Sequence, residues 1–148
     1  MELSKFSVTA HLEYIPQSID SFITTCEGLI ACITNDSSTR FFLKNAVDEF
    51  TVNAMIHGYN KFPGTVTVNA ERFDDHIYLE ISDHGAGVDL AKVNLDKEAR
   101  TIDDLISGGW ALSVLNRISG GLNIAPNSPT GAIFSLRFPV SLKIQQRT

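Results

Sequence analysis

Apolar and polar residues alternate at the start of the chain and then change to a helical spacing. The alternation runs from Phe6 to Tyr14, which is the period-two pattern of a half-buried strand. Pro16 interrupts it. The apolar residues that follow recur every three or four positions, as on one face of a helix: Ile19, Phe22, Ile23, Cys26, Leu29, Ile30 and Ile33. The pattern predicts a strand, then a helix that begins near Pro16.

A polar turn at 35–38 separates this helix from a second one. Ser37 or Ser38 is expected to cap the second helix, because a serine hydroxyl can accept a hydrogen bond from the first free N–H groups. Apolar residues at helical spacing continue from Phe42 to Ala54. We expect the helix to end near Gly58, since glycine adopts the left-handed capping conformation readily.

The second half of the chain predicts more strands, separated by turn signals such as Pro63-Gly64 and Asp74-Asp75. The stretch 88–107 is polar and only weakly periodic. The expected elements are strands over 65–73 and 76–81, a third helix over 110–118, and strands over 122–125 and 133–138.

This order of elements predicts a two-layer α/β sandwich. Short turns join most neighbouring strands, so the sheet should be mixed and mostly antiparallel, covered on one face by helices. The chain has 148 residues, of which 43% are hydrophobic and 20% charged, which fits one globular domain. We expect that domain over 1–140 and a frayed tail over 141–148.

Composition also narrows the classes of partner. The net charge of −5 argues against direct nucleic-acid binding, which requires a basic face. No stretch approaches the roughly 18 apolar residues of a membrane span, and the start of the chain does not resemble a signal peptide, so a cytoplasmic protein without membrane contact is expected. Cys26 and Cys32 lie in an apolar stretch and are expected to be core thiols.

One face of the second helix carries candidate chemistry. Glu49 and Asn53 are four residues apart, so they share a helix face. An amide oxygen is a suitable ligand for Mg²⁺, and a carboxylate one turn away can accept a proton from a nucleophile that attacks a phosphate. His57 follows on nearly the same face. The alternative is an ordinary solvent-exposed face of an amphipathic helix.

Three glycine-containing segments follow. Asp83-His84-Gly85-Ala86-Gly87 ends a strand, where glycines allow close approach of a flat ligand and a buried carboxylate can accept a hydrogen bond from an exocyclic amine. Gly108-Gly109 precedes the third helix and can present N–H groups to an anion. Gly131 opens the last strand. Each segment alone is equally compatible with a plain turn.

In order and spacing, the four segments together resemble the GHKL ATPase superfamily of gyrases, heat-shock chaperones, histidine kinases and mismatch-repair ATPases. The helix motif resembles its asparagine box, and Asp83-x-Gly85-x-Gly87 its adenine-binding glycine box. Gly108-Gly109 resembles the second glycine box, beneath the phosphate lid. The resemblance covers nearly the whole chain and implies binding of ATP and Mg²⁺.

Within the superfamily, Glu49-x-x-x-Asn53-Ala54-x-x-His57-Gly58 most resembles the bacterial anti-sigma serine/threonine kinases. The resemblance implies a sigma factor and an anti-anti-sigma antagonist as partners, and it leaves a homodimer open. The implied roles are Glu49 as general base, Asn53 as Mg²⁺ ligand, Asp83 on the adenine amino group, Gly85 and Gly87 in its pocket, Gly108 and Gly109 under the triphosphate, and His57 and Gly131 also beside the nucleotide.

Two positions depart from the family pattern. Ala111 stands where the family usually has glycine, and Ala132 where many relatives have threonine. These departures keep two alternatives open. The first is an anti-sigma binding module without kinase activity, with nucleotide as a structural or vestigial ligand. The second is a detached histidine-kinase catalytic domain, which the ending at 131–139 also resembles.

Overall fold

The computed structural model describes residues 3–87, 117, 119 and 121–140. Their elements follow the predicted order: β1 Lys5–Leu12, α1 Pro16–Ile33, α2 Ser37–Asn53, η1 Ala54–Gly58, β2 Gly64–Arg72, β3 His76–Asp83, β4 Asn123–Pro126 and β5 Ala132–Pro139. The segment η1 is one turn of π-helix that continues α2. The stretch 88–107, nearly all of the expected helix over 110–118 and the expected tail over 141–148 lie outside the described residues.

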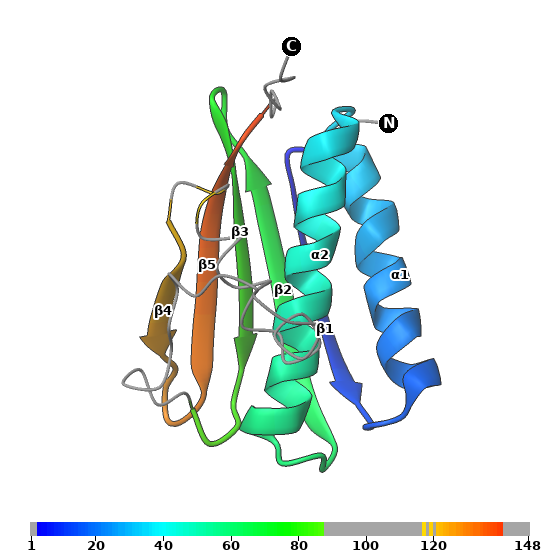
Figure 1. Ribbon diagram of the computed structural model, residues 1–148, viewed down its shortest axis with the longest axis vertical. Helices are drawn as coiled ribbons and strands as arrows, with labels where there is room; N and C mark the ends of the chain where they lie inside the picture. Colours follow the sequence, from blue (N-terminus) through cyan, green and yellow to red (C-terminus); the bar gives the residue numbers. More distant parts are fainter. Residues whose placement is uncertain (1–2, 88–116, 118, 120, 141–148) are drawn as a thin grey trace, which may run out of the picture.

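The strands form one five-stranded sheet in the order β1-β2-β3-β5-β4. Each described pair of neighbours is antiparallel, so the mixed character expected from the sequence is not seen in the described strands. The tight connection between β2 and β3 explains their pairing, because a short hairpin joins only antiparallel strands. Figure 1 shows α1 and α2 side by side on one face of this sheet.

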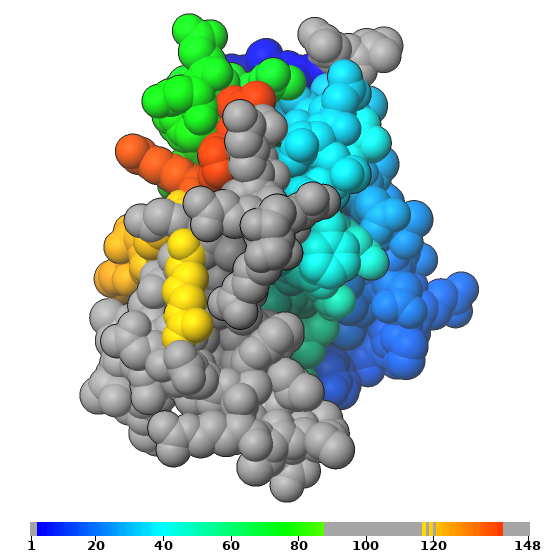
Figure 2. All heavy atoms as spheres, turned by 45° about the horizontal axis from the view of Figure 1, so that its top comes forward, coloured from blue at the N-terminus to red at the C-terminus, as the bar shows by residue number. Residues whose placement is uncertain are grey.

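The core lies between the sheet and the two helices, where α1 packs over β1 and β2 and α2 over β3 and β5. Every second residue is buried from Gly64 to Ala70 in β2 and from Ile77 to Asp83 in β3, which is the outcome that their alternation predicts. The rings of Phe50 and Phe134 stack with their centroids 4.5 Å apart. Figure 2 shows the helices covering one side of the molecule and the β2–β3 hairpin beside the end of β5.

The end of α1 and the start of α2 are held by side chains other than those expected. Asp36, and not Ser37 or Ser38, caps α2: its Oδ2 accepts hydrogen bonds from the Thr39 amide at 2.9 Å and the Thr39 hydroxyl at 2.7 Å. A carboxylate that accepts two bonds at this point also interacts well with the positive end of the helix dipole. The Arg40 guanidinium donates to the Ala31 carbonyl near the end of α1.

Of the two expected core thiols, Cys26 lies in the core and Cys32 does not. Cys26 is fully buried on α1, and burial raises the pKa of its thiol to about 11. Cys32 is half-buried, and both thiols are free. Among the described residues, no helix is long and apolar enough to span a bilayer.

Candidate functional site

The helix face predicted to carry chemistry forms as expected. Both Glu49 and Asn53 are half-buried on α2, and the Asn53 side-chain amide donates to Glu49 Oε1 at 3.4 Å. Burial raises the pKa of the Glu49 carboxyl, with a smaller contribution from the charge of Asp48, while the hydrogen bond from Asn53 lowers it. A raised pKa brings a carboxylate closer to the value that suits a general base near neutral pH.

The helix does not end at Gly58 in a left-handed cap. One π-turn follows Asn53, and the Tyr59 amide donates to the Ala54 carbonyl at 2.9 Å. The left-handed residues come later, at Asn60 with φ 52° and Lys61 with φ 67°. His57 is exposed on this π-turn. Single π-turns occur often at functional sites, and here the turn brings the chain towards the end of β3.

Close packing, and not a left-handed backbone angle, distinguishes Gly58 and Gly85. A Cβ built on Gly58 would lie 3.2 Å from Asp83 Oδ1, and one on Gly85 would lie 2.3 Å from the backbone carbon and oxygen of Gly58. The Ala86 amide donates to the Gly58 carbonyl at 2.7 Å. The end of the Glu49–Asn53 helix is therefore joined directly to the loop that begins at Asp83.

Asp83 is a buried carboxylate at the end of β3, with only 3% of its surface exposed. The Gly85 amide donates to its Oδ1 at 2.9 Å. Burial raises the pKa of Asp83, and backbone hydrogen bonds from Gly85 and Ala132 partly oppose that shift. The arrangement fits the adenine role expected from the sequence, since a buried carboxylate held by backbone amides is a fixed acceptor for an exocyclic amine.

Of the remaining described motif glycines, Gly131 lies against Asp83 and Gly87 lies beside Gly131. Gly131 has φ 118° and Gly87 has φ 91°. A Cβ on Gly131 would lie 2.0 Å from the Asp83 carbonyl oxygen, so only glycine allows this contact. Ala132, which follows, is 2% exposed. Its backbone amide donates to the Asp83 carboxylate and lowers the pKa of that group. That bond does not require a threonine side chain.

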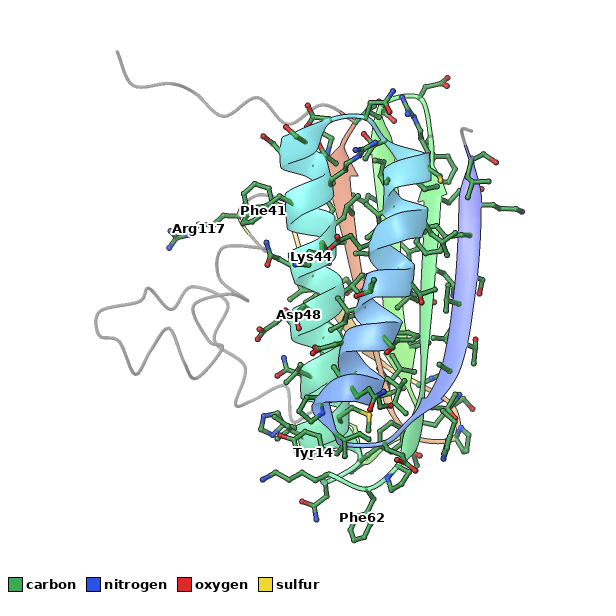
Figure 3. The ribbon with its side chains drawn as sticks, turned by 90° about the vertical axis from the view of Figure 1, so that its right-hand side faces the viewer. Tyr14, Phe41, Lys44, Asp48, Phe62 and Arg117 are labelled. Carbon is green, nitrogen blue, oxygen red and sulfur yellow. The ribbon has the colours of Figure 1, made fainter. Side chains whose placement is uncertain are left out.

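The structure thus brings Asp83, Gly85, Gly87 and Gly131 together beside Gly58, at the end of the helix that carries Glu49 and Asn53. Figure 1 shows the end of α2, the end of β3 and the start of β5 at the same end of the sheet. Gly108, Gly109 and Ala111 lie outside the described residues. Figure 3 shows Asp48, the neighbour of Glu49, projecting from α2 away from α1.

Two residues of this region were not predicted from the sequence pattern. The hydroxyl of Tyr59 accepts a hydrogen bond from the His84 amide at 2.8 Å, and the Asn127 side-chain amide donates to the Asp83 carbonyl at 2.8 Å. Tyr59 directly follows the helix motif and was a visible candidate. Asn127 carried no usable signal, because its partner is 44 residues away in the chain.

Comparison with known proteins adds evolutionary evidence. An anti-sigma F factor of Clostridium botulinum is 32% identical over 91 residues, which cover 60% of this chain and 63% of that protein. A serine-protein kinase RsbW of Oceanobacillus iheyensis is 29% identical over 87 residues, covering 55% of each chain. The chain thus matches less than two thirds of these curated relatives' own length.

A solved structure supports the fold. The histidine kinase domain of a blue-light activated histidine kinase from Erythrobacter litoralis superimposes with a TM-score of 0.56 at 16% identity, covering 82% of this chain and 61% of that one. At this identity the likeness establishes the fold alone, and it confirms the sandwich expected from the sequence. The family model described as the histidine kinase-like ATPase domain matches residues 9–138. Membership of a family of ATPase domains implies ATP binding, and the chain belongs to the histidine kinase-like ATPase domain family.

Proposed function

We propose that this protein is an ATP-binding anti-sigma factor that phosphorylates a serine or threonine of an anti-anti-sigma partner protein. Two observations support the proposal. Relatives with these names match more than half of the chain. The observation that carries it is the contact at Gly58, where the end of the helix that carries Glu49 and Asn53 meets the buried Asp83 carboxylate.

The residues present fit a bound adenine nucleotide with its metal ion. Asp83 is buried, is held by backbone donors and packs against a glycine with no side chain in the way. In the proposal its carboxylate accepts a hydrogen bond from the adenine amino group. Asn53 supplies an amide oxygen for Mg²⁺, which when bound neutralises charge on the phosphates. Gly85 and Gly87 would shape the adenine pocket, with Gly131 and His57 also beside the nucleotide. Gly108 and Gly109, which lie outside the described residues, would lie under the triphosphate.

Glu49 then acts as the general base. As the partner's hydroxyl oxygen attacks the γ-phosphorus of ATP, Glu49 accepts the hydroxyl proton, the bond from the γ-phosphorus to the bridging oxygen breaks, and ADP leaves. The raised pKa of Glu49 suits this role, because the carboxylate must hold the proton after transfer. Positioning and charge neutralisation supply most of the catalysis in such reactions.

The proposed partners are a sigma factor, which the protein would sequester, and the antagonist that it phosphorylates. Both partners work where transcription takes place, so the proposal places the protein in the bacterial cytoplasm. A homodimer is included, because two copies would offer a sigma factor a larger surface. A single domain over 1–140 would contain the whole site.

The direct test is transfer of labelled phosphate from ATP with Mg²⁺ to an anti-anti-sigma protein encoded in the same genome. Wild-type protein and the Asp48→Asn variant should both transfer label, since Asp48 is an exposed neighbour of the proposed base. Glu49→Gln should not. Transfer by Glu49→Gln at the wild-type rate would contradict the assignment of the base.

The assay also separates the two alternatives. The alternative of a binding module is favoured by Ala132, which lacks the hydroxyl common in relatives. If the protein is a binding module, the wild-type chain should bind the sigma factor and transfer no label to any antagonist. A histidine-kinase catalytic domain would give an acid-labile phosphoramidate on a histidine. The proposed kinase gives an acid-stable phosphoester on the partner.

A further inference from the structure

Tyr59 connects three segments that are distant in the sequence. It directly follows η1, and its ring lies against Gly64 at the start of β2, where a Cβ would come within 2.4 Å of the ring carbons. Its hydroxyl donates to the Thr65 carbonyl at 2.5 Å and accepts from the His84 amide at 2.8 Å. One side chain therefore joins the end of the Glu49–Asn53 helix to the residue after Asp83.

The need for this contact follows from where the sheet ends. Asp83 is the last residue of β3 and pairs with Val66 of β2. The His84 amide lies one residue beyond that ladder, so no strand supplies its acceptor and the Tyr59 hydroxyl does. Burial raises the pKa of Tyr59, which keeps the hydroxyl protonated, as donation to Thr65 requires. Figure 3 marks this end of the molecule by Tyr14 and Phe62.

The other side of the same peptide is held by the turn between β4 and β5. The Asn127 side chain donates to the Asp83 carbonyl at 2.8 Å, and the Thr130 hydroxyl donates to the His84 carbonyl at 3.2 Å. Side chains from two different loops thus fix the backbone on which the Asp83 carboxylate is mounted. Of these side chains, Tyr59 is the one that follows the helix carrying Asn53, the proposed Mg²⁺ ligand.

We propose that Tyr59 is a positioning residue for purine recognition: its hydroxyl fixes the Asp83–His84 backbone and so aims the Asp83 carboxylate at the exocyclic amino group of adenine. This inference rests on the proposed function. It also couples the two halves of the site, because the residue that follows the Asn53 helix sets the direction of the base-reading carboxylate. A loss of the hydroxyl should therefore change which base is preferred and not only how stable the fold is.

The test uses Tyr59→Phe, which keeps the ring on Gly64 and removes only the hydroxyl. The matched control is Tyr78→Phe, which loses the bond from the Tyr78 hydroxyl to Glu80 Oε2 near the other end of β3. Dissociation constants are measured for ATP and for ITP, which has a carbonyl where ATP has the amino group. We expect Tyr59→Phe to weaken ATP binding about tenfold, a factor typical of one lost hydrogen bond, and to leave ITP binding within about twofold.

The outcomes separate this inference from the function it rests on. Tyr78→Phe should behave as wild type with both nucleotides. If Tyr59→Phe keeps the wild-type ratio of the ATP and ITP constants, or weakens both equally, Tyr59 is a structural residue and the inference is overturned while the function stands. If the wild-type protein binds neither nucleotide, the proposed function fails and this inference fails with it.

Discussion

Glu49 and Asp83 are the two acids of the proposed site, and they are held in different ways. Burial raises the pKa of both, but Glu49 lies on a regular helix and its described hydrogen bond is to another side chain, Asn53, at a long 3.4 Å. Asp83 lies at the end of a strand and is held by backbone amides of Gly85 and Ala132. Backbone donors cannot rotate away, so Asp83 is fixed while Glu49 retains freedom.

This difference matches the two tasks in the proposed function. A group that recognises a base needs a fixed direction, and backbone amides from two segments provide it. A general base needs a pKa near the working pH and room to receive a proton, which a half-buried side chain with one weak partner provides. In the proposed function, the contrast assigns recognition of the base to the carboxylate with backbone donors and proton transfer to the carboxylate on the helix.

The largest expected effect is that substitution of one acid reduces phosphoryl transfer, whereas substitution of the other reduces ATP affinity. Glu49→Gln should reduce phosphoryl transfer by about 10³-fold, within the usual range for loss of a general base, and leave ATP affinity unchanged. Asp83→Asn should weaken ATP binding by about 1.5–3 kcal/mol, the range for a hydrogen bond to a charged group. Isothermal titration calorimetry measures ATP affinity, and the label-transfer assay measures phosphoryl transfer. A similar loss of ATP affinity in both variants would remove the distinction.

The fixed position of Asp83 also depends on the packing of two glycines. Gly85→Ala would place a methyl 2.3 Å from the Gly58 backbone, and we expect a loss of about 3 kcal/mol in the free energy of unfolding because backbone must move. Gly28→Ala is the matched control, since a Cβ on Gly28 in α1 meets nothing within 4 Å. It should add about 0.5–1 kcal/mol, the usual gain for alanine over glycine in a helix. Denaturant titration measures the free energy of unfolding of both variants. A Gly85→Ala protein as stable as wild type would contradict the close contact.

Asn53→Ala tests the partner of Glu49 as the proposed Mg²⁺ ligand. Without the amide ligand, the gain in ATP affinity produced by Mg²⁺ should fall about tenfold, or about 1.4 kcal/mol. The hydrogen bond from Asn53 lowers the pKa of Glu49. Loss of that bond should therefore raise the pKa and move the acid limb of the pH–rate profile for phosphoryl transfer to higher pH. Asn45→Ala, which removes a bond to the Phe41 carbonyl on the same helix, is the control and should change neither quantity.

The smallest expected effect is on stability as a function of pH. Both acids have a folded pKa above the unfolded one, so between those values the folded state binds more protons than the unfolded state. Stability contributed by these groups is therefore highest at low pH and falls as pH rises through that window. Glu49→Gln and Asp83→Asn should each flatten this part of the curve, as pH-dependent denaturant titration would show. A steeper decline in either variant would contradict the direction of the shift.

Local pattern was enough for most of the fold because the periods of strand and helix are set by backbone geometry. The alternation in β2 and β3 and the three-to-four spacing in α1 and α2 predicted these elements within about two residues. The helix ends were less predictable. Asp36 competes with Ser37 and Ser38 for the same amides, and the choice depends on side-chain geometry that neighbours in sequence do not reveal.

Spacing along the chain fixes which side chains share a helix face, so the four-residue spacing of Glu49 and Asn53 was enough to pair them. The sequence also located Asp83 at a strand end and the glycines beside it. The packing of the layers was needed to show that Gly85 must lack a side chain where it meets the Gly58 backbone, and that Tyr59 and Asn127 hold the Asp83–His84 peptide from opposite sides. These contacts join residues 25 to 44 positions apart, and such distances are fixed by how the layers pack and not by any local repeat.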